Sequence, residues 1–163
     1  MQDHDPERDR FILVIDPNRD HAQVVQQVLG QGSSRDSQSV QEPTQNEYPS
    51  QNRFEILVNG GAAIDYLLQQ GDYAQAPRPD LVLLDLDLPG GGHHILTTIK
   101  TTPHLKRIPV IVFTESDRTE DVLRSYTSQS NCYVVKAADL EHLSHTVKQI
   151  EAFWLEIVTL PLK

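Results

Sequence analysis

Hydrophobic residues along this chain form short continuous runs, and longer stretches with amphipathic spacing separate these runs. Continuous apolar runs of this length predict strands that are buried on both faces, as at the centre of a parallel sheet. These runs cover residues 11–15, 81–84 and 108–113, and further strands are expected over 132–135 and, shorter, over 54–58. Apolar residues three and four apart follow each run, and this spacing predicts a helix after every strand.

The helical segments carry recognisable start and stop signals. Gly30 ends the first helix, Gly71 ends a second helix over 62–70, and a third helix stops before Pro103. Asp117, with Glu120 three residues later, forms a capping-box pattern for the fourth helix. The fifth helix is long and is expected to be capped by Asp139. Its apolar residues alternate three and four apart through residue 157, which is typical of a narrow seam.

Five strands that alternate with five helices predict an α/β fold. The expected architecture is a five-stranded parallel sheet, doubly wound as (βα)5, with helices on both faces and right-handed crossovers. Two segments depart from the alternation. Residues 1–10 are predicted to be a disordered N-terminal tail, and residues 31–52, rich in Ser, Gln, Asn and Pro, a flexible polar insertion. We therefore expect a single domain over 11–163 that ends in a C-terminal extension, 153–163.

Composition narrows the classes of function. The 163 residues carry a formal charge of −9, and the few basic residues are scattered, which argues against a nucleic-acid partner. No apolar run could span a bilayer and no signal segment is evident, so we expect no membrane partner and a cytoplasmic location. The single cysteine, Cys132, excludes an internal disulfide and is expected to be a small core residue rather than a redox sensor.

Chemically active side chains stand where the buried strands end. Asp16 follows the first strand, Asp85 and Asp87 follow the third, Thr114 ends the fourth and Lys136 follows the fifth. In open α/β sheets ligands bind beyond the carboxyl ends of the strands, so these groups are expected on one edge. Singly, each is commonly a turn residue, a cap or a surface charge. Their occurrence together on four strands favours a functional site.

The residue types at this edge suit phosphoryl transfer. Close carboxylates such as Asp16 and Asp85 repel each other, and a bound cation relieves the repulsion. Oxygen ligands with open water positions suit Mg²⁺. Thr114 and Lys136 could hydrogen-bond and neutralise an anion placed on Asp85. A metal, a nucleophilic carboxylate, a hydroxyl and an ammonium together predict that Asp85 becomes an aspartyl phosphate.

The stretches around these positions resemble the receiver domains of two-component response regulators. The similarity runs from residue 11 to 157 around the polar insertion, and it rests on residues 14–16, 83–89, 113–114 and 133–136. A narrower similarity, to the stand-alone response regulators of cyanobacterial phytochromes, rests on residues 77–81, 105–110, 131–133 and 153–161. The resemblance implies the flavodoxin-like strand order 2-1-3-4-5.

The resemblance also implies roles for the strand-end residues. Asp85 would accept phosphate from the histidine of a kinase, and Lys136 would contact the phosphoryl oxygen. Asp16 and Asp85 would bind Mg²⁺ through their side chains, and Asp87 through its backbone carbonyl. The protein would then be a phosphoacceptor rather than an enzyme, any catalysis being self-phosphorylation from a donor.

The resemblance further implies a switch and its partners. Thr114 and Tyr133 would move with the phosphoryl group, and the fourth helix, fifth strand and fifth helix would shift with them. The expected partners are a histidine kinase, phytochrome-type by the narrower similarity, and a downstream protein reader. A homodimer is expected through the same face, extended by the C-terminal tail.

Two departures from the receiver pattern leave an alternative open. The family usually has a pair of acids at the end of the first strand, whereas this chain has Ile15 before Asp16, and glycines 90–92 form a shorter loop than usual. One alternative is therefore a pseudo-receiver, a binding module with an incomplete acidic pocket that takes no phosphate. A third alternative, a small nucleotide- or flavin-binding enzyme, lacks the phosphate-binding loop that it needs. His93 and His94 are interpreted as exposed surface residues.

Overall fold

The structure is a computed structural model that describes residues 10–30 and 52–161. Within these residues five parallel strands form one sheet in the order β2-β1-β3-β4-β5, which confirms the predicted fold and strand order. The strands are β1 (Phe11–Ile15), β2 (Arg53–Leu57), β3 (Leu81–Leu84), β4 (Val110–Thr114) and β5 (Cys132–Val135).

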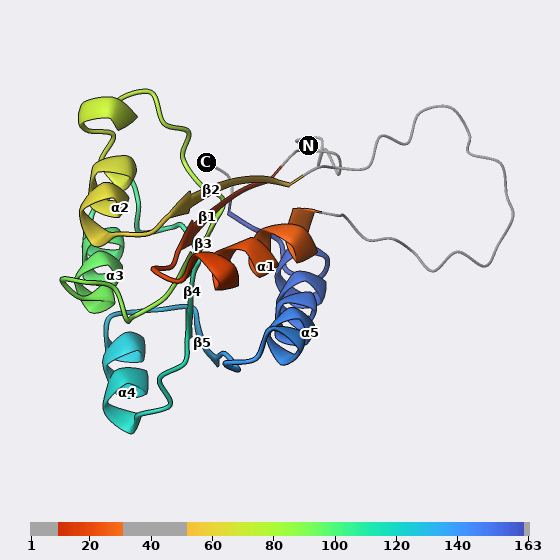
Figure 1. Cartoon of the computed structure of the whole chain (residues 1–163). Coiled ribbons are helices and arrows are strands. Elements are labelled where there is room, and N and C mark those ends of the chain that lie inside the picture. Colours follow the sequence, from red (N-terminus) through yellow and green to blue (C-terminus); the bar gives the residue numbers. More distant parts are fainter. Residues whose placement is uncertain (1–9, 31–51, 162–163) are drawn as a thin grey trace, which may run out of the picture.

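Helices cover both faces of the sheet. Figure 1 shows α1 and α5 on one face, and α2 and α3 on the other with α4 beyond them. The helices are α1 (Arg19–Gly30), α2 (Gly60–Leu67), α3 (Gly92–Thr101), α4 (Thr119–Thr127) and α5 (Leu140–Ile150). A short 3₁₀ turn, η1 (Gly71–Tyr73), follows α2, and a π-helical turn, η2 (Glu151–Leu155), continues α5.

The core consists of two hydrophobic clusters, one on each face of the sheet. Successive residues of a strand point to opposite faces. In β1, Leu13 and Ile15 therefore pack with α2 and α3, while Ile12 and Val14 pack with α1 and α5. All residues of β1, β3 and β4 are buried, as their continuous apolar runs predict.

The start of α4 differs from the prediction. The helix begins at Thr119 with Arg118 at the N-cap position, and no side chain caps it, so the expected capping box of Asp117 and Glu120 does not form. A different contact holds the first turn, because the Ser116 hydroxyl donates to the Asp121 carboxylate at 2.5 Å.

The last helix is capped as predicted but divides its apolar residues between two surroundings. The Asp139 side chain accepts a hydrogen bond from the backbone N–H of His142 at 2.9 Å. The π turn η2 continues the helix after Ile150, and Trp154, an expected member of the seam, packs partly buried against the same hydrophobic cluster as Leu143 and Val147. Leu143, Val147 and Ile150 are buried, whereas Leu140, Phe153 and Ile157 are exposed.

The predicted tail and insertion lie almost entirely outside the described residues. Only their ends, Arg10 and Asn52, are described. The Arg10 carbonyl accepts from the backbone N–H of Arg53 at 2.8 Å, and the Asn52 amide donates to the Leu29 carbonyl at 2.9 Å. Over the described ranges, the structure contains no helix with the length and apolar character needed to cross a membrane.

Candidate functional site

Strand pairing brings the predicted acidic residues together. Ile15 of β1 is in register with Leu84 of β3, so Asp16 and Asp85 leave the sheet side by side. Backbone hydrogen bonds fix these exits: the Asp85 N–H donates to the Ile15 carbonyl at 2.9 Å, and the Lys136 N–H donates to the Thr114 carbonyl at 2.8 Å. The predicted edge therefore exists.

Lys136 forms the centre of this edge. Its Nζ lies 2.7 Å from Oδ2 of Asp16 and 2.6 Å from Oδ2 of Asp85. All three side chains are at least 95% buried, so the two carboxylates share one ammonium away from water. One counter-charge for two buried anions leaves the cluster negative, and burial of an incompletely paired charge is costly.

The other carboxylate oxygens are also hydrogen-bonded. Oδ1 of Asp85 accepts from the Thr114 hydroxyl at 2.9 Å and from the backbone N–H of Asp87 at 2.8 Å. Oδ1 of Asp16 accepts from the backbone N–H of Asn18 at 2.8 Å. These contacts fix both carboxylates in orientation, which is the preorganisation that a nucleophilic or metal-binding carboxylate needs.

Burial and, after it, the neighbouring negative charge raise the pKa of two acids at the site. Burial raises the pKa of Asp16, against the lowering effect of Lys136, and the charge of Asp85 raises it further. Burial, followed by the charge of Asp85, also raises the pKa of Asp87. A cation would therefore be bound favourably at this position.

The donor set fits Mg²⁺. Asp16 and Asp85 offer carboxylate oxygens, and the backbone of Asp87 adjoins Asp85, to which its N–H donates. Within the described part of the chain, no group of three or more His, Cys, Asp or Glu side chains could hold a metal ion. The protein would thus supply a partial set of hard oxygen ligands, and Mg²⁺ commonly keeps several waters alongside one or two carboxylates.

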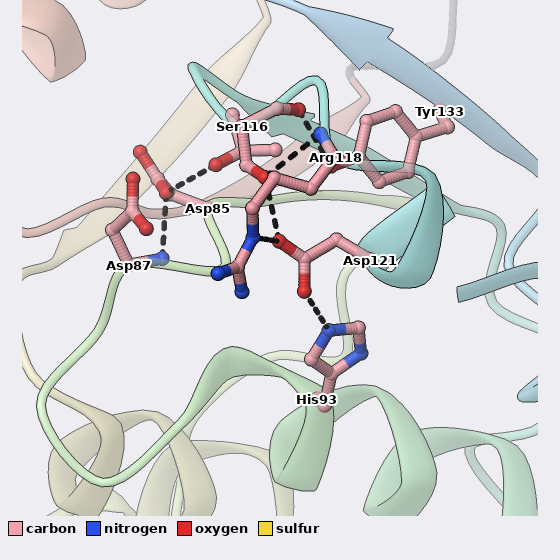
Figure 2. A network of polar contacts seen from close by, with 8 residues as sticks. Asp85, Asp87, His93, Ser116, Arg118, Asp121 and Tyr133 are labelled. Carbon is pink, nitrogen blue, oxygen red and sulfur yellow. Dashed lines mark hydrogen bonds and ion pairs between the residues drawn. The ribbon is translucent and has the colours of Figure 1, made fainter. Parts of the chain in front are cut away.

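A second polar network lies beside the first and joins α3, α4 and β5 through the loop between β4 and α4 (Figure 2). At its centre, Oδ2 of Asp121 accepts from the Ser116 hydroxyl at 2.5 Å and from Nε of Arg118 at 3.2 Å, and Oδ1 lies 3.2 Å from Nε2 of His93. The Tyr133 hydroxyl donates to the Ser116 carbonyl at 2.7 Å. The network therefore links α3, the first turn of α4, the loop before α4, and β5.

The interpretation of His93 as a surface residue is wrong. His93 is only 8% exposed because it lies on the face of α3 that packs toward α4, whereas His94 is exposed as predicted. Its partner Asp121 is strongly acidic: hydrogen bonds from Ser116, His93 and Arg118 lower the pKa of Asp121 to about 2. The sequence places His93 and Asp121 on separate helices, and no local pattern marks them as a pair.

The predicted residues are thus only partly assembled in one place. Asp16, Asp85, Thr114 and Lys136 form one contact cluster. The Asp87 side chain is exposed and joins that cluster through its backbone. Tyr133 is half-buried and contacts the loop after Thr114 rather than the carboxylates.

Comparisons with known proteins identify this arrangement. The response regulator receiver domain family matches residues 58–148. The chain is also 46% identical over 153 residues to the response regulator Rcp1 of Synechocystis, and the match covers 93% of each protein. This chain belongs to the response regulator receiver family.

Two solved structures of receivers are similar over nearly the whole chain. The Mn²⁺-bound form of Rcp1 matches with a TM-score of 0.78 and 40% identity, covering 94% of this chain and 99% of Rcp1. The phosphorylated cyanobacterial phytochrome response regulator RcpA matches with a TM-score of 0.81 and 36% identity, covering 95% and 100%. One of these relatives thus contains a divalent metal and the other a phosphoryl group.

Ile15 is the residue at which this receiver departs most from the acidic pattern. Its side chain is fully buried in the hydrophobic cluster between the sheet and the helices α2 and α3. It therefore contributes packing and no charge to the site. The receiver has one acid at the end of β1, Asp16, where the expected pattern has two.

Proposed function

We propose that this receiver accepts a phosphoryl group on Asp85 from the phosphorylated histidine of a sensor kinase. The observation that carries the proposal is the position of the Asp85 carboxylate, held by Lys136 at 2.6 Å and by Thr114 at 2.9 Å. A carboxylate oxygen of Asp85 would attack phosphorus and form a P–O bond while the P–N bond of phosphohistidine breaks. The electron pair of that bond returns to the imidazole ring.

The neighbours of Asp85 would stabilise the new acyl phosphate. Lys136 Nζ already contacts Asp85, and it would turn to the added phosphoryl oxygen. The Thr114 hydroxyl would likewise follow the phosphoryl group. Asp16, Asp85 and the backbone carbonyl of Asp87 would hold Mg²⁺, whose charge offsets that of the transferring phosphoryl oxygens.

Movement of Thr114 would be transmitted through the second network. Thr114 lies two residues before Ser116, whose carbonyl accepts from Tyr133 and whose hydroxyl donates to Asp121. A shift of this loop would change the position of Tyr133 on β5 and of the first turn of α4. We place the output surface on α4, β5 and α5 for this reason, and a protein partner would read it there.

The source of the phosphoryl group is inferred from the relatives. RcpA is a cyanobacterial phytochrome response regulator, and this chain is similar to it over 95% of its length. We infer that a phytochrome-type histidine kinase is the donor, and that the whole of 11–163 forms one receiver domain that signals by protein contact.

The test is phosphorylation by acetyl phosphate with Mg²⁺, followed by intact mass measurement. A mass gain of one phosphoryl group is expected in the native protein and in Asp87→Asn, which keeps its backbone carbonyl. Asp85→Asn should show no gain. Absence of a gain in the native protein, or a gain that survives Asp85→Asn, would contradict the proposal.

The buried Ile15 supports one second candidate, a pseudo-receiver that binds partners without phosphate. Ile15→Asp distinguishes the two functions when it is added to the same experiment. If only Ile15→Asp gains phosphate, the native pocket is silent and the binding-module function holds. We expect the native protein to be labelled, and Ile15→Asp to be destabilised by about 3 kcal/mol because it places a charge in the core.

A further inference from the structure

A cavity of about 310 Å³ opens at the edge of the sheet opposite Asp85. Its walls come from the loop before β3 (78–80), from the loop between α3 and β4 (103–109), and from Pro161 in the C-terminal tail. These loops lead into the amino ends of β3 and β4. Because the strands are parallel, this edge of the sheet lies opposite the edge that carries Asp85. The proposed phosphotransfer therefore makes no use of this cavity.

The cavity is lined by positive charge in an acidic protein. Arg78, Lys106 and Arg107 contribute to its walls together with His104, although the chain as a whole carries a net charge of −9. Among the described residues, no ion pair joins the side chains of Arg78, Lys106 or Arg107 to a carboxylate. Three permanent cations that form no ion pair with another described residue make a site that attracts anions.

The acidic residue in the wall is already engaged. Oδ2 of Asp80 accepts a hydrogen bond from the backbone N–H of Phe11 at 2.8 Å, which ties this carboxylate to the start of β1. Asp80 thus helps to hold β1 in the sheet. Its single negative charge is outnumbered by the three positive charges in the cavity wall.

Lys100 adds a fourth positive charge, because its ammonium contacts the backbone of the cavity wall. Its Nζ donates to the Ile108 carbonyl at 3.0 Å, to the Asn131 side-chain oxygen at 2.9 Å and to the Lys106 carbonyl at 3.4 Å. All three acceptors are neutral, so they orient the ammonium without cancelling its charge. The half-buried position of Lys100 also places this charge in a medium that screens it less than water does.

The walls are preformed rather than loose. Pro79 and Pro109 are buried, and proline fixes the backbone φ angle. Within the loop, the Lys106 N–H donates to the Thr102 carbonyl at 3.0 Å and the Ile108 N–H donates to the Leu105 carbonyl at 2.9 Å. A rigid site loses little conformational freedom when it binds a ligand, which favours affinity.

We propose that this cavity binds a small organic dianion, either a phosphate monoester or a dicarboxylate. Its volume lies at the lower limit of about 300–1,000 Å³ that is common for ligand sites, which excludes large cofactors. Arg78 and Arg107 offer the planar donor pairs that recognise carboxylate and phosphate oxygens. The cavity unites parts of 77–81, 105–110 and 153–161, the stretches that carry the narrower similarity to the stand-alone regulators.

The test is a titration of the full chain with glycerol 3-phosphate and, separately, with succinate. Binding would be followed by calorimetry and by amide NMR shifts at constant ionic strength, with sodium chloride as the reference. We expect saturable binding of one probe with a Kd below about 1 mM, and shifts concentrated at 78–80 and 104–109. The probe that binds more tightly identifies the phosphate or the carboxylate class.

Two variants test whether binding depends on the basic residues of the cavity. The double variant Lys106→Gln with Arg107→Gln should weaken binding by at least about tenfold, because it removes two charged donors from exposed positions. Lys148→Gln, at an exposed position on α5, should bind as the native chain does. Equal binding by the double variant, binding no stronger than that of chloride, or shifts centred on Thr114 and Lys136 would each overturn the proposal.

Discussion

At the scale of single residues, the candidate site is built around one buried ammonium that pairs with two carboxylates. Lys136 Nζ contacts Asp16 and Asp85 at nearly equal distances, 2.7 and 2.6 Å, so neither acid has its own counter-ion. This sharing leaves the pair with an excess negative charge, which would favour the proposed binding of Mg²⁺. It also makes Lys136 indispensable to the stability of the site.

Lys136→Met should therefore lower both the stability of the fold and the labelling of Asp85. It leaves two buried carboxylates without a counter-ion, and the loss of one partner of a buried ion pair typically costs about 3–5 kcal/mol. Urea unfolding at pH 7 would measure this cost, with Lys148→Met as the exposed control. Labelling by acetyl phosphate should fall at least about tenfold in Lys136→Met. Unchanged unfolding and labelling would show that the ammonium is dispensable.

Asp121 gives a prediction about pH. Its pKa is lowered to about 2 in the folded protein, from 3.8, chiefly by hydrogen bonds from Ser116 and His93. A group whose folded pKa is depressed adds stability above its unfolded pKa, and this stability is lost as pH falls through the folded value. Asp121→Asn should thus cost about 1 kcal/mol at neutral pH, a figure reduced for solvent screening, and almost nothing near pH 2.

The control for this measurement is the nearby acid Asp117, which is exposed in the same loop. Urea unfolding of native protein, Asp121→Asn and Asp117→Asn would be compared from pH 7 down to pH 2. Asp117→Asn should change stability by less than about 0.5 kcal/mol throughout. A destabilisation of Asp121→Asn that is constant with pH would mean that its charge plays no part.

At the scale of elements, the strands could be predicted from the sequence and the helix contacts could not. The runs 11–15, 81–84 and 132–135 are strands with the predicted bounds. The first two are buried on both faces, as their continuous apolar sequences predict, whereas 132–135 is the partly exposed edge strand. Asp16 and Asp85 meet because parallel strand ends share an edge. The pairing of His93 with Asp121 depends on how α3 packs against α4, and such packing leaves no local pattern.

The start of α3 requires a glycine at position 92, because it lies directly against the backbone that follows β3. A Cβ at Gly92 would lie 2.6 Å from the backbone carbonyl oxygen of Asp85 and 2.6 Å from Cα of Leu86. Both obstacles are backbone, so they cannot turn aside. Gly92 thus allows α3 to begin directly against the residue that we propose as the phosphoryl acceptor.

Gly92→Ala should destabilise the fold by about 1–3 kcal/mol and slow the labelling of Asp85, because the α3 start must move away. Gly61→Ala is the matched control in α2. A Cβ there meets only the Asn59 side-chain oxygen at 3.6 Å, an ordinary contact, so alanine should be neutral or stabilise the helix by about 0.5–1 kcal/mol. Thermal unfolding would measure the change in stability of both variants, and mass labelling would measure the change in phosphorylation. Equal stability and equal labelling of the two variants would contradict the prediction that a Cβ at Gly92 clashes with the backbone.

At the scale of the whole molecule, exposed apolar residues gather on the proposed output surface. Large hydrophobic side chains on α4, β5, α5 and η2 are about half exposed or more, namely Leu123, Tyr126, Val135, Leu140 and Phe153. Beside them, an open cavity of about 540 Å³ is lined mainly by apolar groups of β5, α5 and the tail, including Cys132, Val134, Phe153 and Trp154. Large apolar side chains left exposed in this way are typical of a protein interface.

We predict that a second copy of this receiver covers that surface and that phosphorylation of Asp85 strengthens the contact. Sedimentation at tens of micromolar should show a dimer after treatment with acetyl phosphate and Mg²⁺. Val135→Glu places a charge at an exposed position of the edge strand β5 and should weaken the dimer at least about tenfold, since a buried unpaired charge opposes association. Thr97→Glu adds the same charge at an exposed position of α3 and should leave the dimer intact. A phosphorylated protein that remains monomeric, or a dimer that is indifferent to Val135→Glu, would assign the apolar surface to a different partner.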